Sequence, residues 1–211
     1  MGDYIYLHGF ASGPQSYKGT WLQSRLQTHG IDLLRLDLNQ ENFTHLTLTR
    51  QIQQVTQQIQ GPTTLIGSSL GGLVAAWATQ QSDHVERLIL LAPAFDFLTQ
   101  WLAHLGPEQM KNWQTTGWLS VYHYGLQAQQ QLHYDFLTDA QRYPDSQLNK
   151  STPTLILHGQ RDEVISLNAS RLYTQHRPWV TLYPLDTDHG MADAMEDIWQ
   201  HIQDFCQLSP C

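Results

Sequence analysis

A glycine- and serine-rich run between two apolar segments constrains the fold of this chain more than any other feature. The run occupies residues 67–72 and reads GSSLGG; the apolar segment 63–66 precedes it, and a helical pattern follows. A G-x-S-x-G pattern at such a junction is typical of a strand-to-helix turn so sharp that its central serine is strained. Side chains two residues to either side would clash there, so both positions need glycine. Ser69 meets this requirement and Ser68 does not.

Ser69 is therefore the candidate nucleophile. A turn of this kind projects the serine oxygen above the sheet, at the N-terminus of the next helix. A second interpretation is that Ser69 only caps that helix, a position that serine favours. Ser68 is better explained as a small residue packed beneath the turn.

Short apolar segments alternate with helical patterns along most of the chain. Such alternation predicts right-handed βαβ crossovers, and hence a mostly parallel sheet with helices on both faces. A chain of 211 residues then forms one domain, an α/β fold with a reduced sheet of about six strands. The predicted strands are 3–7, 31–36, 63–66, 87–91, 154–157 and 179–183, and helices are predicted at 17–29, 46–59, after the GSSLGG run to about 80, at 167–176 and at 191–206.

Residues 94–150 interrupt this alternation. We expect a helical, cap-like insertion after the fourth strand, with one short extended piece near 118–124. The glutamine-rich stretch 127–131 fits a solvated helix face. The aromatic side chains of the insertion either line an acyl pocket or form its own core. They include three of the seven tryptophans of the chain, Trp101, Trp113 and Trp118.

Charge and composition exclude several classes of protein. Eleven Lys and Arg against nineteen Asp and Glu give a net charge of −8, so the basic face that a nucleic-acid partner requires is missing. No apolar run reaches the roughly 18 residues of a membrane span, and we expect no signal peptide. The two cysteines, Cys206 and Cys211, are too few for a structural zinc site and too close to the end to staple a core. We therefore expect a reduced, cytoplasmic protein.

His189 is the candidate general base for Ser69. A serine is a weak nucleophile without a base, and in this type of fold the order along the chain is Ser, then Asp or Glu, then His. His189 lies in the loop after the last predicted strand, and Gly190 gives the imidazole freedom to reach inward. His176 and His201 fall in predicted helices. A solvated loop histidine is the alternative interpretation of His189.

Asp162 is the candidate acid that orients His189. It follows the fifth predicted strand, where its carboxylate could accept the Nδ1–H of the imidazole and stabilise the imidazolium. Glu163 is a rival that would point the other way on a turn. Asp186 and Asp188 are rivals on the loop of His189 itself, too near it in sequence, and Asp188 is better explained as a residue that shapes this loop.

Two backbone N–H groups are expected to stabilise an oxyanion. One belongs to Leu70, directly after the nucleophile, and the other to Phe10, in the loop after the first strand, where Gly9 permits close approach. His8 and His158 each end a strand before a glycine. Either could be a ligand or a second base, but we expect both to hold their loops by hydrogen bonds to the backbone.

Several segments together resemble known families. They are Tyr6-Leu7-His8-Gly9-Phe10, Ser12-x-Pro14-x-Ser16-x-Lys18, the run 67–72 and Asp188-His189. This set resembles the serine α/β-hydrolases, and within them the small YqiA-like esterases. The later half is also similar to mitochondrial α/β-hydrolases that act as palmitoyl-protein thioesterases, in Trp113-x-x-x-Gly117-Trp118, Leu157-His158-Gly159-x-x-Asp162 and Asp188-His189-x-Met191. The resemblance implies a triad of Ser69, Asp162 and His189, ester or thioester hydrolysis, and no cofactor.

The sequence therefore predicts a serine hydrolase that cleaves a small-molecule ester or thioester through an acyl-enzyme on Ser69. A protein depalmitoylase, an acyltransferase and a non-catalytic binding protein of the same fold are the alternatives. Dehalogenases and epoxide hydrolases are disfavoured because they have Asp at the position of Ser69. We expect neither a metal nor a cofactor, since the chain contains no H-E-x-x-H, Cys/His cluster or phosphate-binding loop. The expected assembly is a monomer or homodimer.

Overall fold

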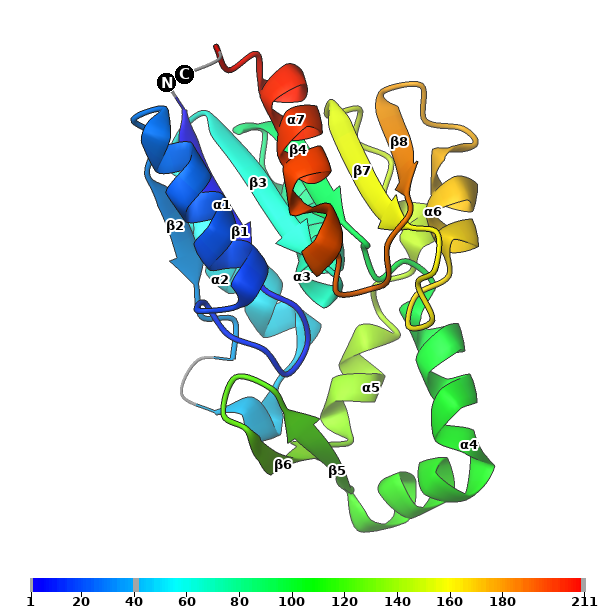
Figure 1. The fold of residues 1–211 in the computed structure, drawn as a ribbon. Helices are drawn as coiled ribbons and strands as arrows, with labels where there is room; N and C mark the ends of the chain where they lie inside the picture. The colour runs from blue at the N-terminus through cyan, green and yellow to red at the C-terminus, as the bar shows by residue number, and fades with distance from the viewer. Residues whose placement is uncertain (1, 40–41, 210–211) are drawn as a thin grey trace.

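One six-stranded parallel sheet forms the centre of the structure, a computed structural model that describes residues 2–39 and 42–209 (Figure 1). The strand order is β2-β1-β3-β4-β7-β8, and every neighbouring pair is parallel. The bounds of these strands are β1 (Asp3–Leu7), β2 (Leu33–Leu36), β3 (Thr63–Ser68), β4 (Val85–Leu91), β7 (Thr154–Gly159) and β8 (Val180–Leu185). The expected mostly parallel sheet of six strands is confirmed.

Helices cover both faces of the sheet (Figure 1). Two of them, α1 (Tyr17–Thr28) and α7 (Met195–Cys206), pack together on one face. The other face carries α2 (Leu48–Gln58), α3 (Leu70–Gln81) and α6 (Leu167–Thr174). Short 3-10 helices precede α2 and α7, at η1 (Phe43–His45) and η3 (Ala192–Ala194). Because both faces are covered, strands such as β3 are buried along their whole length.

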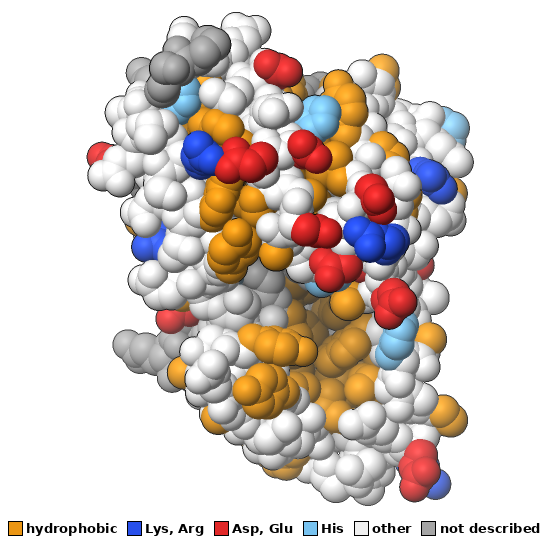
Figure 2. All heavy atoms as spheres, in the orientation of Figure 1, with side chains coloured by type: hydrophobic (Ala, Val, Ile, Leu, Met, Phe, Trp, Pro, Cys, Tyr) orange, Lys and Arg blue, Asp and Glu red, His pale blue; other side chains and the backbone are white. Residues whose placement is uncertain are grey.

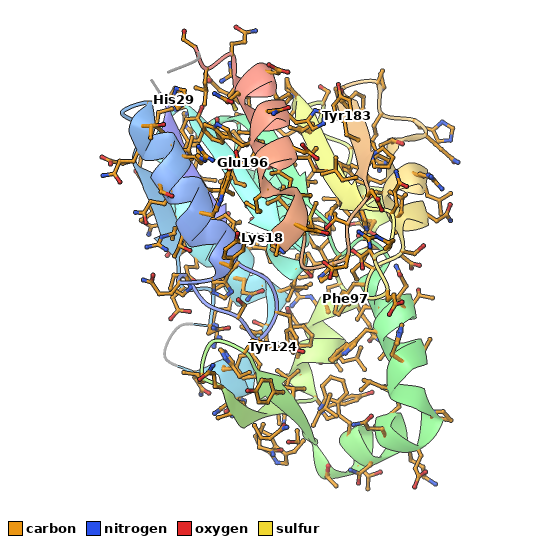
Figure 3. All side chains as sticks on the ribbon, viewed as in Figure 1. Lys18, His29, Phe97, Tyr124, Tyr183 and Glu196 are labelled. Carbon is orange, nitrogen blue, oxygen red and sulfur yellow. The ribbon has the colours of Figure 1, made fainter. Side chains whose placement is uncertain are left out.

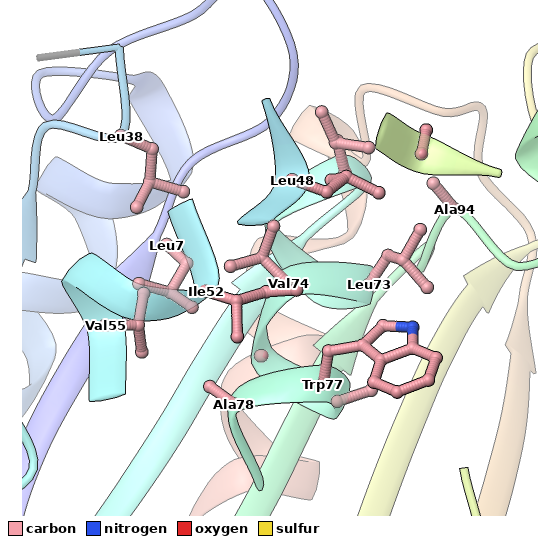
Figure 4. Close-up of a cluster of buried hydrophobic side chains, with 14 of the residues drawn as sticks. Leu7, Leu38, Leu48, Ile52, Val55, Leu73, Val74, Trp77, Ala78 and Ala94 are labelled. Atoms are coloured by element: carbon pink, nitrogen blue, oxygen red, sulfur yellow. The ribbon is translucent and has the colours of Figure 1, made fainter. Parts of the chain in front are cut away.

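The larger part of the core lies between the sheet and α2 and α3 (Figure 4). On α2, Leu48, Ile52 and Val55 recur at helical spacing and are buried. Gln51 is buried with them and donates from Nε2 to the carbonyl oxygen of Leu38, whereas Gln53 is exposed and Gln54 is partly exposed. The α3 helix is buried from Leu70 to Thr79, so it is apolar on nearly all sides. Such a helix is fixed firmly against the sheet, and its N-terminus is held in place above β3.

The insertion between β4 and β7 contains a β-hairpin that the sequence analysis did not predict. Its elements are α4 (Phe97–Thr116), β5 (Trp118–His123), β6 (Ala128–His133), α5 (Asp135–Ala140) and η2 (Asp145–Gln147). The expected extended piece near 118–124 is β5, but the expectation of a helix face at 127–131 is wrong. The six residues of β6 carry three glutamines and only one buried side chain, Leu132, so local pattern gives no strand signal. Antiparallel pairing with β5 determines its conformation.

The insertion lies across the edge of the sheet where β3, β4 and β7 end (Figure 1). Its long helix α4 bends at Gly106, which has a φ of 73°, directly before Pro107. Trp113, on the second half of α4, is fully buried and donates a hydrogen bond from Nε1 to the carbonyl oxygen of Leu132 (3.0 Å). This contact fixes the hairpin to the helix, so the insertion is one packed unit.

Both cysteines of the chain lie near its C-terminal end. Cys206 is a buried free cysteine at the end of α7, and Cys211 lies outside the described residues. Within residues 2–39 and 42–209, no helix has both the length and the apolar character needed to cross a bilayer.

Candidate active site

Ser69 occupies the turn between β3 and α3, in the conformation that the GSSLGG run predicts. Its φ is 53° and its ψ is −121°, a strained combination for a residue with a side chain. A Cβ on Gly67 would lie 2.4 Å from the carbonyl oxygen of Gly71, and one on Gly71 would lie 2.3 Å from that of Leu7. Both glycines are therefore required by backbone contact. The Ser69 side chain makes no capping hydrogen bond to α3, and Ser68 is buried beneath the turn.

The structure brings Ser69, His189 and Asp162 together from three separate loops. His189 lies in the loop after β8, and its Nε2 is 3.1 Å from Ser69 Oγ. On the other side of the ring, Nδ1 is 2.7 Å from Asp162 Oδ2. With the Nδ1–H donating to the carboxylate, Nε2 is free to accept the hydroxyl proton of Ser69. Parallel strands bring these loops to one edge of the sheet because their carboxyl ends meet there.

The carboxylate of Asp162 is completely buried and accepts four hydrogen bonds or close N–H contacts. Its Oδ1 accepts from the backbone N–H groups of Val164 (2.9 Å) and Ile165 (2.8 Å). Its Oδ2 faces His189 and, at 3.2 Å, Nε2 of His158. Burial alone would raise the pKa of Asp162, but hydrogen bonds from His158 and His189 outweigh it and hold the pKa well below its usual range. Asp162 is therefore an ionised acceptor.

His158 has a role that the sequence analysis anticipated only in part. As expected, it bonds to the backbone of its loop: Nε2 donates to the carbonyl oxygen of Ile165 (2.9 Å). Because a carbonyl oxygen can only accept, the proton lies on Nε2, and Nδ1 accepts from the hydroxyl of Ser170 (2.8 Å). That same N–H faces Asp162. His158 thus holds the acid in place, a contact that its position at the end of β7 alone did not reveal.

Lys18 is a site residue that the sequence analysis did not single out for chemistry. Its Nζ donates to the carbonyl oxygens of Gly190 (3.0 Å) and His189 (3.4 Å), so α1 is tied to the loop that carries the imidazole. Burial lowers the pKa of Lys18 from 10.5 to about 8, although the negative charges of Asp162 and Asp188 act in the opposite direction. The only sequence signal for Lys18 was its place in the segment 12–18.

The two expected oxyanion donors lie beside Ser69. Phe10 and Leu70 both line the cavity that contains Ser69. Within the described part of the chain, no acceptor receives a hydrogen bond from the backbone N–H of Phe10 or of Leu70. A Cβ added to Gly9 would lie 3.3 Å from Ser69 Cβ, so the loop after β1 passes directly against the serine. His8 holds this loop as expected, with Nδ1 bonded to the carbonyl oxygen of Gly9 (2.8 Å) and Nε2 accepting from the Leu38 N–H (3.0 Å).

A cavity of about 440 Å³ extends from Ser69 between the sheet and the insertion. Figure 2 shows the hollow with hydrophobic side chains inside it, and Figure 3 labels Phe97 and Tyr124 from the insertion at this end of the sheet. The ring centroids of Trp101 and Phe10 lie 5.7 Å apart, so the two side chains pack together. The insertion aromatics lie in two places: Trp101 lines the cavity, whereas Trp113 belongs to the core.

The three acidic residues considered as alternatives to Asp162 do not contact the imidazole of His189 through a side-chain hydrogen bond among those described. Asp188 accepts a hydrogen bond at Oδ1 from the backbone N–H of Met191 (3.0 Å) and so shapes the loop of His189, as expected. Asp186 is exposed and pairs with Arg161 at 3.0 Å. Glu163 is exposed at the edge of the cavity.

One cluster among the described residues has the composition of a metal site. His45, His133 and Asp135 offer ligand atoms within 4.8 Å of one another. His133 Nδ1 already lies 2.9 Å from Asp135 Oδ2. None of the three lines the cavity of Ser69, so the cluster takes no part in the site described here.

The sequence profile of one family matches residues 3–207 of the chain, and that family is described as Uncharacterised protein family (UPF0227). The chain belongs to UPF0227. This is the family of the YqiA-like esterases, so the resemblance inferred from the sequence is confirmed. No curated protein sequence matches the chain significantly.

Solved structures share the fold of this UPF0227 member. Alpha/beta hydrolase domain-containing protein 10 from mouse superimposes with a TM-score of 0.82 at 22% identity, over 97% of this chain and 89% of the other. Est1E from Butyrivibrio proteoclasticus, solved with ferulic acid bound, gives 0.83 at 19% identity, over 98% and 88%. The alpha/beta hydrolase GrgF from Penicillium sp. sh18 gives 0.74 at 14% identity, over 98% and 89%. These similarities establish the α/β-hydrolase fold.

Proposed function

We propose that this protein is a serine hydrolase that cleaves carboxylic esters or thioesters through an acyl-enzyme on Ser69. The observation that carries the proposal is the chain of hydrogen bonds from Ser69 through His189 to Asp162, beside a mostly apolar cavity. A non-catalytic binding protein has no need for a strained serine aligned with an imidazole and a buried carboxylate. Backbone strain of this kind concentrates at functional sites.

In the acylation half-reaction, His189 Nε2 takes the proton of the Ser69 hydroxyl while Oγ attacks the carbonyl carbon of the substrate. The carbonyl oxygen becomes an oxyanion, which accepts hydrogen bonds from the N–H groups of Phe10 and Leu70. Asp162 stabilises the imidazolium and stays ionised, since its pKa is held low. The imidazolium then gives its proton to the leaving alcohol or thiol, and the acyl group remains on Ser69.

Deacylation repeats these steps with water. His189 takes a proton from a water molecule, whose oxygen attacks the acyl carbon, and the same two N–H groups hold the second oxyanion. Collapse of this intermediate breaks the bond to Ser69, and the imidazolium returns the proton to Oγ. The products are a carboxylic acid and the free enzyme.

The cavity suits an apolar acyl group of small to medium size. Its volume of about 440 Å³ lies in the range of small-molecule sites. Its wall includes the aromatic rings of Phe10, Phe97 and Trp101, which favour stacking with flat or apolar groups. Ferulic acid, bound by Est1E, is an acid of this kind. The proposal extends to aromatic acids and to short aliphatic acids.

Hydrolysis of a matched ester and thioester tests the proposal. We expect the protein to cleave p-nitrophenyl butyrate, S-butyryl-N-acetylcysteamine or both, and the ratio of the two rates distinguishes an esterase from a thioesterase. Ser69→Ala should abolish the activity. Ser68→Ala, at the neighbouring buried serine, is the matched control and should retain it. Folded protein that cleaves neither substrate, or that keeps its activity in Ser69→Ala, would contradict the proposal.

A further inference from the structure

Two histidines and one aspartate form a compact group where the insertion meets the segment before α2. His45 is the last residue of η1, His133 ends β6, and Asp135 begins α5. Each residue offers one ligand atom, and the three atoms lie within 4.8 Å of one another. The β5–β6 hairpin lies beside the segment that leads into α2, and β6 contacts η1 there (Figure 1). The fold therefore brings together ligands that are far apart in the sequence.

The rings of the two histidines pack against each other and against one tryptophan. The ring centroids of His45 and His133 lie 5.2 Å apart. The ring of Trp118 meets both imidazoles edge-on, with centroid distances of 4.7 Å to His133 and 5.6 Å to His45. This packing restricts both imidazoles before a ligand binds, which lowers the entropic cost of binding.

The ligand atoms have a spacing that a divalent ion can bridge. Nδ1 of His133 lies 2.9 Å from Oδ2 of Asp135. In a tetrahedral zinc site with bonds of about 2.0–2.1 Å, neighbouring ligand atoms are about 3.3 Å apart. His133 and Asp135 already have nearly this separation. The ring nitrogen of His45 has to approach by roughly 1.5 Å at most, a shift that an exposed side chain can make.

A hydrated ion can reach all three side chains. His45 and Asp135 are exposed, and the side chain of His133 is 28% exposed. Within residues 2–39 and 42–209, Asp135 forms no ion pair with a lysine or an arginine, so no fixed cation competes for its carboxylate. The net charge of −8 also favours the approach of a cation.

From this set of ligands we infer that the protein binds one divalent transition-metal ion, with zinc as the best match, at His45, His133 and Asp135. Imidazole nitrogen suits zinc and its neighbours in the first transition row, whereas Ca²⁺ and Mg²⁺ prefer oxygen ligands. Three protein ligands leave the fourth position of a tetrahedral zinc ion to water. The sequence analysis expected no metal because it found no metal-binding motif, and this set forms none, since His45 belongs to a different segment from His133 and Asp135.

A bound ion holds the insertion against the rest of the domain. Its ligands come from both sides of that contact, because η1 leads into α2 whereas β6 and α5 belong to the insertion. Phe43, also in η1, packs against Phe10 with ring centroids 5.7 Å apart, and Phe10 lines the cavity of Ser69. The ion therefore stabilises the surroundings of the cavity without lining it. This role does not depend on the proposed function.

Isothermal titration calorimetry with Zn²⁺, on the full chain after treatment with a chelator, tests the inference. We expect one zinc ion per chain, and zinc at about 100 times its dissociation constant should raise Tm by about 5 °C or more, because the ion binds the folded chain. Mg²⁺ and Ca²⁺ should do neither. His45→Ala and His133→Ala should each weaken zinc binding about tenfold or more. His176→Ala, at an exposed histidine outside the cluster, is the control and should leave it unchanged.

Anomalous diffraction at the zinc absorption edge locates the ion in the wild-type protein, so the inference stays testable where a variant fails to fold. The expected position is about 2.0–2.1 Å from a ring nitrogen of both His45 and His133. A folded wild-type protein that binds no zinc overturns the inference, since His133 and Asp135 would then form only an ion pair. Zinc that binds only elsewhere, or whose affinity survives both substitutions, overturns it too.

Discussion

Replacing Asp162 by asparagine exchanges one carboxylate oxygen for an NH2 group, and the surroundings dictate which oxygen is lost. Two backbone N–H groups, from Val164 and Ile165, donate to Oδ1 at 2.9 and 2.8 Å. Both need an acceptor, so the remaining carbonyl oxygen stays on that side. The NH2 group then takes the place of Oδ2, the atom that lies 2.7 Å from Nδ1 of His189.

This exchange reverses the polarity of the contact with the imidazole. An NH2 group donates to Nδ1, which leaves the imidazole proton of His189 on Nε2. A protonated Nε2 cannot take the proton of Ser69, although all heavy atoms keep their places. In a serine protease with the same triad this exchange lowers kcat by roughly 10⁴-fold, or about 5.5 kcal/mol at about 1.4 kcal/mol per factor of ten. We expect a loss of this order here.

Hydrolysis of p-nitrophenyl butyrate at pH 7 measures the effect, with thermal unfolding to show that the variant is folded. A kcat/KM within tenfold of the wild-type value in folded Asp162→Asn would refute the argument, because it would mean that His189 does not depend on a carboxylate acceptor.

The pH dependence of the unfolding free energy tests the low pKa of Asp162 independently of activity. The pKa of Asp162 is lower in the folded protein than its ordinary value of 3.8. A carboxyl of this kind stabilises the fold above its unfolded pKa, and the contribution disappears as the pH falls towards the folded pKa. The difference in unfolding free energy between wild type and Asp162→Asn should therefore be largest near neutral pH and shrink below about pH 4. A difference that does not change with pH would contradict the low pKa.

Two further substitutions test the contacts that hold the turn of Ser69 and the loop of His189 in place. Gly71→Ala should destabilise the protein by about 3 kcal/mol or more, because the new Cβ would lie 2.3 Å from the carbonyl oxygen of Leu7 at the end of β1. Gly61→Ala is the control: no atom lies within 4 Å of a Cβ at that position, so thermal unfolding should hardly change. Lys18→Met should lower kcat/KM about tenfold in folded protein, because the loop of His189 loses its charged hydrogen bonds. Lys150→Met removes a similar hydrogen bond from a lysine to a backbone carbonyl oxygen elsewhere in the protein, and it should leave kcat/KM unchanged. Equal losses of kcat/KM in both variants would argue against a specific role for Lys18.

The parts of the site that sequence could predict are those that backbone geometry imposes. The turn at Ser69 requires glycine at 67 and 71 because backbone atoms occupy the space of a Cβ, and such a requirement is visible in the sequence itself. The positions of His189 and Asp162 followed from chain order and from the shared edge of parallel strands.

The parts that sequence could not predict depend on contacts between distant segments. The β6 strand has no pattern of its own, and its conformation depends on pairing with β5. Lys18 reaches residues more than 170 positions away, so no local pattern indicates its bonds to the His189 loop. The contact of His158 with Asp162 depends on a side-chain orientation that Ser170 fixes from α6.

Labelling with a fluorophosphonate, followed by intact-mass measurement, tests the central claim most directly, because the reagent bonds only to an activated serine and needs no knowledge of the substrate. The account predicts one adduct on the wild-type protein, one on Ser68→Ala, none on Ser69→Ala and greatly slowed labelling of His189→Ala. No adduct on folded wild-type protein, or an adduct that persists in Ser69→Ala, would contradict the assignment of Ser69 as the nucleophile.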